Sequence, residues 1–113
     1  VAGFSRDKSV ADMVNRLARV NPVSQEKPIV FAARSRHPRS LPAAAIAAHF
    51  GNEGIDAVES ASVADAVTQA LALASPGDLV LATGSLFVVA EAREAILGIE
   101  PEIYPDLLPQ DLR

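Results

Sequence analysis

The sequence predicts an α/β domain in which a mostly parallel sheet of about four strands carries helices on both faces. Short apolar segments typical of buried strands alternate with helical segments four times between residues 1 and 98. The composition is 50% hydrophobic and only 4% aromatic, which suits alanine- and valine-rich helices packed on a parallel sheet. Right-handed crossovers then favour parallel neighbours in the sheet.

The stretch 77–98 carries the clearest structural signal. Leu79–Ala82 is a continuous apolar run, which predicts a parallel strand covered on both faces. A Thr-Gly-Ser corner at 83–85 leads into a predicted helix over Leu86–Leu97, which Gly98 can end. Helix N-termini favour anions, and ligands of open parallel sheets bind outside the carboxyl ends of the strands. We therefore expect the functional site at this corner.

The remaining elements repeat the pattern along the chain. In order, they are a partial strand at Val1–Phe4, a helix with an apolar stripe at Val10, Met13, Val14, Leu17 and Val20, a strand at Ile29–Ala33, a short helix from Pro42 to Phe50, a half-exposed edge strand at Ile55–Glu59, and a helix capped by Ser62 and Asp65. The last of these helices has a predicted apolar face of Val63, Ala66, Val67, Ala70, Leu71 and Ala74. Residues 99–113 are expected to form an irregular tail.

Composition excludes several functional classes. The chain has 113 residues, enough for one domain, and it lacks cysteine, which excludes disulfides, thiolate catalysis and cysteine metal sites. Its formal net charge of −4 is unfavourable for binding nucleic acid or an anionic membrane. The given N-terminus lacks the charged-then-apolar layout of a signal peptide, and no apolar run reaches the roughly 18 residues that a membrane helix needs. We therefore expect a cytoplasmic protein.

Two loops that follow predicted strands carry half of the basic residues: Arg6, Lys8, Arg34, Arg36 and Arg39. Loops after parallel strands share one edge of the sheet, so these loops and the 83–85 corner predict a cationic rim for a phosphate or a carboxylate. Ordinary surface arginines are the alternative. The acidic group in these loops is Asp7, which leaves a paired-carboxylate mechanism without support.

Two further residues have open roles at this edge. His37 is either a proton carrier or a polar surface residue. The predicted core face of the Leu86–Leu97 helix is Val88, Val89, Ala92, Ala95 and Ile96. Phe87 points away from that face, either toward a ligand or neighbouring domain, or under a cover from Tyr104 and Leu107. Thr83 and Gly84 complete the set of candidate site residues.

Familiar nucleotide and phosphate motifs are missing. No G-x-x-x-x-G-K-[ST] loop and no G-x-G-x-x-G loop is present, so the chain supplies no nucleotide-binding loop of its own. The strand ends at residues 31–33 and 59–61 lack the aspartate cluster of a phosphoacceptor receiver domain. No catalytic residue and no metal site is predicted.

The segment GDLVLATGSLFVVAEAREAIL resembles the last strand and helix of folylpolyglutamate synthase and dihydrofolate synthase, members of the Mur ligase superfamily. GFSRDKSVADM resembles the segment of their C-terminal domain in which an Asp-Lys pair opens a helix. The loop RSRHPRSLP and the helical segment SVADAVTQALALA are similar to the family's corresponding loop and helix in position and type. The resemblance implies a Rossmann-like glutamate ligase domain over residues 1–98. The family's opening D-G-A-H-N-P strand is absent, so we expect an N-terminally truncated piece of a larger enzyme.

The resemblance also implies the reaction. The complete enzyme would be an ATP-dependent, ADP-forming ligase that phosphorylates a folate or dihydropteroate carboxylate, which the amino group of L-glutamate then attacks. Lys8 would face a glutamate carboxylate and Ser85 would hydrogen-bond the same amino acid. ATP and Mg²⁺ would be bound mainly by the central ATPase domain of the same chain, and the 113-residue piece alone would hold neither and be inactive. A non-catalytic anion-binding or protein-interaction module is the alternative.

Overall fold

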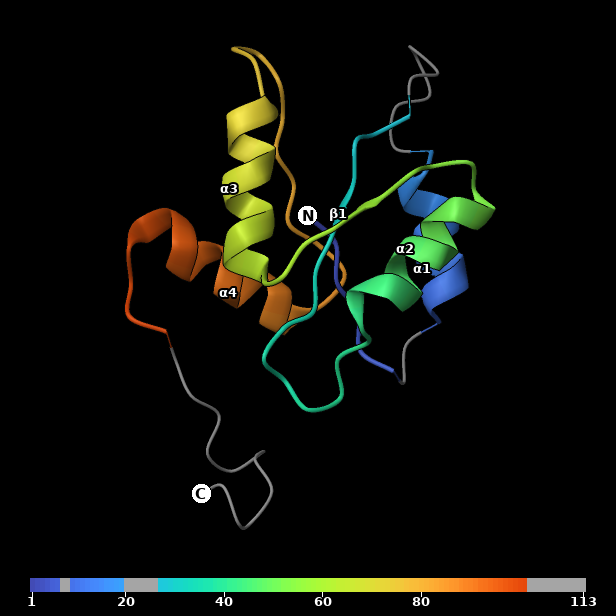
Figure 1. Ribbon diagram of the computed structural model, residues 1–113, viewed down its shortest axis with the longest axis horizontal. Coiled ribbons are helices and arrows are strands. Elements are labelled where there is room, and N and C mark those ends of the chain that lie inside the picture. The colour runs from blue at the N-terminus through green and yellow to red at the C-terminus, as the bar shows by residue number, and fades with distance from the viewer. Residues whose placement is uncertain (7–8, 20–26, 102–113) are drawn as a thin grey trace.

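The computed structural model describes residues 1–6, 9–19 and 27–101. Its elements are α1 (Val10–Leu17), β1 (Phe31–Ala32), α2 (Ala43–Asn52), β2 (Val58–Glu59), α3 (Val63–Leu73) and α4 (Leu86–Leu97). Extended segments run through the centre, with α1 and α2 on one side and α3 and α4 on the other (Figure 1). The predicted α/β class is confirmed.

The sheet is small and parallel. β1 pairs with β2 in parallel, with Phe31 opposite Val58 and Ala32 opposite Glu59. Single parallel bridges join Ala2 to Ala32 on one side and to Thr83 on the other. Four chain segments therefore lie side by side in the order 83, 2, β1, β2, but only β1 and β2 qualify as strands among the described residues. The predicted number of about four strands is not shown, because the segments at residues 2 and 83 pair through isolated bridges only.

The alternation of side chains along the central segments builds two apolar layers. Val30 and Ala32 face α1 and α2, whereas Phe31 and Ala33 face α3 and α4. The first layer comprises Ala2, Phe4, Val10, Val14, Val30, Ala32, Ile46, Phe50 and Ile55. The second comprises Phe31, Ala33, Val63, Ala66, Val67, Ala70, Val88 and Ala92. A sheet covered on both faces explains why its segments read as continuous apolar runs.

The helices of the second layer begin and end at predicted signals. The Ser62 side chain accepts a hydrogen bond from the Asp65 amide at 3.0 Å and caps α3. α4 spans Leu86–Leu97 as predicted, and Gly98 ends it in the left-handed conformation at φ +66°. The predicted face of α3 is confirmed at its four buried positions, Val63, Ala66, Val67 and Ala70, but Leu71 is exposed.

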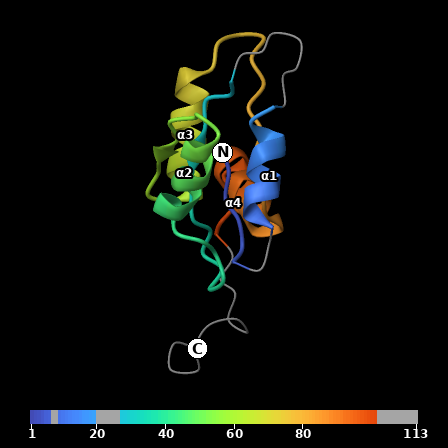
Figure 2. The same ribbon diagram turned by 90° about the vertical axis from the view of Figure 1, so that its right-hand side faces the viewer.

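The apolar stripe predicted for the first helix is confirmed at the positions that the structure describes. Val10 and Val14 of α1 are buried, and Met13 and Leu17 pack against the same core. α1 packs beside α2 (Figure 2), which begins just after Pro42. Val20 lies outside the described residues, as do residues 102–113 of the predicted tail, including Tyr104 and Leu107.

The predicted burial of Leu79–Ala82 on both faces is wrong. Leu79 is 87% exposed and Leu81 is 49% exposed. Val80 and Ala82 pack against the α3–α4 layer. No residue of 79–82 belongs to the core under α1 and α2, to which the extended segments contribute Ala2, Phe4, Val30, Ala32 and Ile55. Among residues 1–6, 9–19 and 27–101, none therefore covers the other face of this outermost segment.

Candidate functional site

The carboxyl edge of the sheet is the end at which residues 2–5, β1 and residues 79–83 finish. There the loop of residues 34–41 folds back across the chain after Ala2. Leu41 donates its amide to the Phe4 carbonyl at 2.8 Å, and Arg6 donates its amide to the Arg39 carbonyl at 2.9 Å. An antiparallel bridge joins Ser5 to Ser40 between these bonds. The two basic loops are thereby joined along one edge.

The 83–85 corner lies beside the same strand end. Gly3 donates its amide to the Thr83 carbonyl at 3.2 Å. Gly84 follows with φ +105°, and a side chain at this position would collide with the Gly3 carbonyl oxygen and approach the Phe4 ring to 2.8 Å. Only glycine allows the chain to turn this closely against residues 3 and 4, and this contact fixes where α4 begins.

Ser85 occupies the N-cap of α4. Its Oγ accepts a hydrogen bond from the Phe87 amide at 3.1 Å, and the residue is half-buried. A serine hydroxyl that accepts this bond keeps its own hydrogen for donation. The corner therefore combines an O–H donor with the positive end of a helix dipole, a combination suited to a carboxylate.

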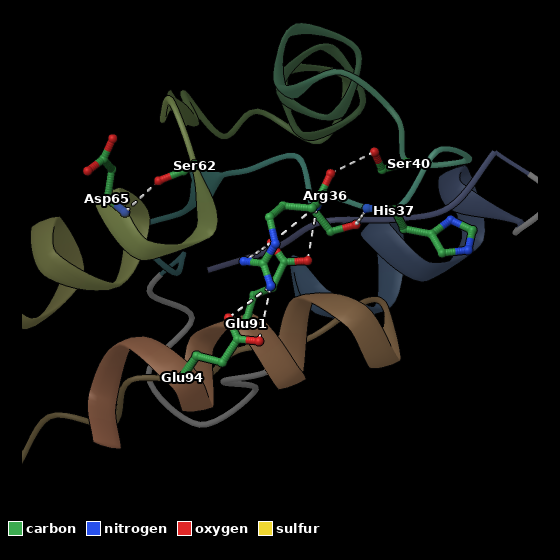
Figure 3. A network of polar contacts seen from close by, with 8 residues as sticks. Arg36, His37, Ser40, Ser62, Asp65, Glu91 and Glu94 are labelled. Atoms are coloured by element: carbon green, nitrogen blue, oxygen red, sulfur yellow. Dashed lines mark hydrogen bonds and ion pairs between the residues drawn. The ribbon is translucent and has the colours of Figure 1, made fainter. Parts of the chain in front are cut away.

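Arg36 links the basic loop to α4 (Figure 3). Its guanidinium donates to both oxygens of Glu94 at 3.0 Å and lies 3.5 Å from Glu91 Oε1. Its backbone amide also donates to both carboxylate oxygens of Glu91, at 3.2 and 3.0 Å. The Glu91 and Glu94 side chains are only 3% and 9% exposed, whereas that of Arg36 is 42% exposed. We call this set of contacts the Arg36 latch.

The latch corrects the predicted apolar face of α4. Val88 and Ala92 are buried as predicted, but Val89, Ala95 and Ile96 are exposed. Glu91 and Glu94 are buried in their place because the loop of residues 34–40 supplies a cation and an amide to these carboxylates. The signal that sequence reasoning missed is a pair of glutamates three residues apart in an acidic chain with an arginine-rich loop.

The same loop is stabilised by short internal hydrogen bonds. Arg34 Nε donates to Ser40 Oγ at 3.1 Å, and Ser40 Oγ donates to the Ser35 carbonyl at 3.0 Å. His37 Nδ1 accepts the Arg39 amide at 3.0 Å. The His37 ring lies against the Phe87 ring, with centroids 4.1 Å apart. Phe87 is therefore half-buried against this loop, one turn from Ser85.

The structure thus brings most predicted site residues to one edge of the sheet. Arg6, Arg34, Arg36, His37 and Arg39 lie on the two joined loops, and the corner and Phe87 lie beside them. Asp7 and Lys8 fall outside the described residues. Within residues 1–6, 9–19 and 27–101, no group of three or more His, Asp or Glu side chains could hold a metal ion. None of the described helices has the length and apolarity needed to cross a membrane.

Comparison with known families supplies the remaining evidence. The family model described as Mur ligase, glutamate ligase domain matches residues 1–86, a range that includes both Lys8 and Ser85. Searches of curated proteins and of solved structures found no match.

Proposed function

The chain belongs to the Mur ligase family as its glutamate ligase domain, and on this basis we propose that it supplies the L-glutamate site of a folylpolyglutamate or dihydrofolate synthase. Enzymes that carry this domain are ATP-dependent amide ligases. The folate specificity of the proposal rests on the resemblance of residues 77–97 to the last strand and helix of those synthases.

The observation that carries the proposal is the position of Ser85. Its half-buried hydroxyl caps α4 beside the strand end from which the chain continues through Arg6 toward Lys8. A carboxylate at the corner would accept the Ser85 hydrogen and face the N-terminal amides of α4. Lys8 would supply the counter-charge, and Arg6, Arg34 and Arg39 of the joined loops would raise the local positive potential, whereas the charge of Arg36 is offset by Glu91 and Glu94.

In the proposed reaction, the γ-phosphoryl group of ATP passes to the carboxylate of a folate or of dihydropteroate. The amino nitrogen of the bound glutamate then attacks the acyl carbon, the amide bond forms, and inorganic phosphate leaves. The described residues would bind and orient glutamate so that its amine faces the acyl phosphate. ATP and Mg²⁺ are assigned to the central ATPase domain, and the described residues offer no cluster that fits a metal.

The test is a ligation assay on the complete protein that contains this chain. We expect ADP release to require both L-glutamate and a folate or dihydropteroate acceptor, and the product mass to increase by one glutamyl residue. The 113-residue chain alone should show no turnover. Ligation to a different class of acceptor only would contradict the folate assignment.

A Lys8→Ala variant separates the glutamate site from the rest of the enzyme. It should raise the KM for glutamate by more than about tenfold, since loss of a charged partner costs about 1.5–3 kcal/mol or more. The KM values for ATP and for the folate should change far less.

Absence of ligation by the complete protein with every acceptor would instead favour a non-catalytic anion-binding or protein-interaction module.

A further inference from the structure

One stripe of α4 faces the basic loop that follows β1. Phe87, Glu91 and Glu94 stand at i, i+4 and i+7, a spacing that places their side chains on the same side of a helix. The His37 ring lies against the first of them, and Arg36 contacts both glutamates (Figure 3). The loop therefore holds α4 at three successive positions along one line.

These contacts fix the rotation of α4 about its own axis. The Arg36 guanidinium donates to both oxygens of Glu94, and the Arg36 amide donates to both oxygens of Glu91. Because both oxygens of each carboxylate are held by charge-assisted bonds, the direction of each side chain is restricted as well as its position. A rotation of the helix would break at least one of these pairs of bonds.

The rotation of α4 sets the direction of the Ser85 hydroxyl. Ser85 Oγ accepts the Phe87 amide at 3.1 Å, so the serine is tied to the first turn of the helix. Phe87 is also the first residue of the stripe that the loop holds. A rotation of α4 would therefore change where the hydroxyl points at the carboxyl edge.

The loop is anchored well enough to serve as a reference for α4. Ser40 Oγ donates to the Ser35 carbonyl at 3.0 Å, which closes the loop on itself. The Leu41 amide then donates to the Phe4 carbonyl at 2.8 Å, in the segment that continues toward Lys8. The loop thus connects this segment to α4, and these two parts of the chain carry the proposed glutamate-binding residues.

Stability alone does not explain two carboxylates at these positions. The Glu91 and Glu94 side chains are almost fully buried, and apolar residues in place of a buried ion pair are often equally or more stabilising. Buried polar pairs can instead select one arrangement among several. Val89 and Ile96 on the exposed side of α4 are apolar too, so apolar contacts alone do not define which side of this helix faces the domain.

We propose that Arg36 is a positioning residue of the glutamate site. The Arg36 latch, together with the His37–Phe87 contact, fixes the rotation of α4 and thereby points the Ser85 hydroxyl at the glutamate carboxylate. This inference rests on the proposed function, because it assigns Arg36 to the same site. Arg36 acts through Ser85, so its effect on glutamate binding exists only while the serine hydroxyl is present.

The test is a double-mutant cycle on the complete enzyme, measured as the KM for glutamate. Ser85→Ala should raise this KM about tenfold and Arg36→Met about fivefold, with the KM for ATP unchanged. Because Arg36 acts through Ser85, the double variant should remain near tenfold, whereas independent effects would multiply to roughly fiftyfold. Arg93→Met, on the exposed side of α4, is the matched control and should leave the glutamate KM within about twofold of wild type.

Arg36→Lys separates geometry from charge and replaces Arg36→Met in the cycle if that variant does not fold. Lysine keeps the positive charge but lacks the planar guanidinium, so we expect a glutamate KM raised about threefold. A wild-type KM for Arg36→Lys would show that only the charge matters and would overturn the positioning role.

Two further outcomes distinguish this inference from the proposed function. If Ser85→Ala raises the glutamate KM but the Arg36 variants do not, or if the effects multiply in the cycle, the positioning role is wrong and the proposed function stands. If Ser85→Ala leaves the glutamate KM unchanged, both are wrong.

Discussion

The two ends of the sheet differ in how many backbone hydrogen bonds and ion pairs they make and in how far their apolar side chains are exposed. At the carboxyl edge, loops cross the strand ends, Gly84 packs against residues 3 and 4, and the Arg36 latch ties the loop to α4. At the opposite end of the sheet, which we call the amino edge, Leu79 and Ile29 are exposed and line a groove of about 520 Å³ beside Val1. The comparison shows that polar contacts between distant segments order one end of the sheet, whereas apolar side chains of the described residues stay exposed at the other.

The most severe way to break the carboxyl edge is Gly84→Ala. The added Cβ collides with the Gly3 carbonyl and the Phe4 ring, in a backbone conformation with φ +105° that side chains rarely adopt. We expect a loss of about 3 kcal/mol or more in the free energy of unfolding, measured by urea denaturation.

Gly77→Ala is the matched control for this substitution. Gly77 has a similar φ of +91°, but an added Cβ meets nothing within 4 Å. Its loss should therefore be limited to the conformational strain, about 1 kcal/mol. Equal losses for the two variants would show that the close approach at the 83–85 corner contributes nothing.

A smaller effect is expected from breaking the Arg36 latch with Arg36→Met. The substitution removes the guanidinium that Arg36 places against the buried carboxylates of Glu91 and Glu94. Removing one partner of a buried pair costs about 3–5 kcal/mol, but the Arg36 side chain is 42% exposed, so we expect about 2 kcal/mol by urea denaturation.

Arg93→Met on the exposed side of α4 is the control for the latch and should change the stability by no more than about 0.5 kcal/mol. Adding Glu94→Gln to the Arg36→Met variant should recover part of the loss, because it removes a buried charge. A latch variant as stable as the Arg93 variant would mean that the ion pairs do not stabilise the edge.

The smallest expected effect on stability comes from the Val1 amino group at the amino edge, and it depends on pH. Burial lowers the pKa of the Val1 ammonium below its usual 8.0. The unfolded chain therefore holds this proton more tightly, and the charged amine destabilises the fold at low pH. This cost disappears as the pH rises through the folded pKa toward 8.0.

N-terminal acetylation removes the titrating group. The acetylated chain should be more stable than the free chain at pH 6, and the difference should shrink as the pH approaches 8. Because the histidines are the same in both chains, the difference isolates the amine. A difference in stability that stays constant with pH would contradict burial of the ammonium.

The sequence predicted the features that depend on local signals. The bounds of α4, its Gly98 end and the Ser62 cap follow from residues adjacent in the chain, and all are confirmed. Burial of Glu91 and Glu94 was missed because it depends on a loop more than fifty residues away. Exposure of Leu79 was missed for a similar reason, since a continuous apolar run does not show which face the helices leave uncovered.

The candidate site was predictable in part for the same reason. The 83–85 corner and the two basic loops follow strands, so their placement at one edge follows from parallel topology. The contacts among them, such as the His37–Phe87 pair and the bond from Arg6 to Arg39, require the antiparallel return of the 34–41 loop. No periodic pattern in the chain signals that return.

The most direct test of the glutamate site compares two serines with the same local role. Ser62 and Ser85 cap α3 and α4 through one amide bond each, at 3.0 and 3.1 Å. Either alanine variant of the complete enzyme should lose about 1 kcal/mol of stability. We predict that only Ser85→Ala raises the KM for glutamate, by about tenfold, with the KM for ATP unchanged. Equal glutamate KM values for Ser62→Ala and Ser85→Ala, within about twofold, would contradict the assignment of the carboxyl edge.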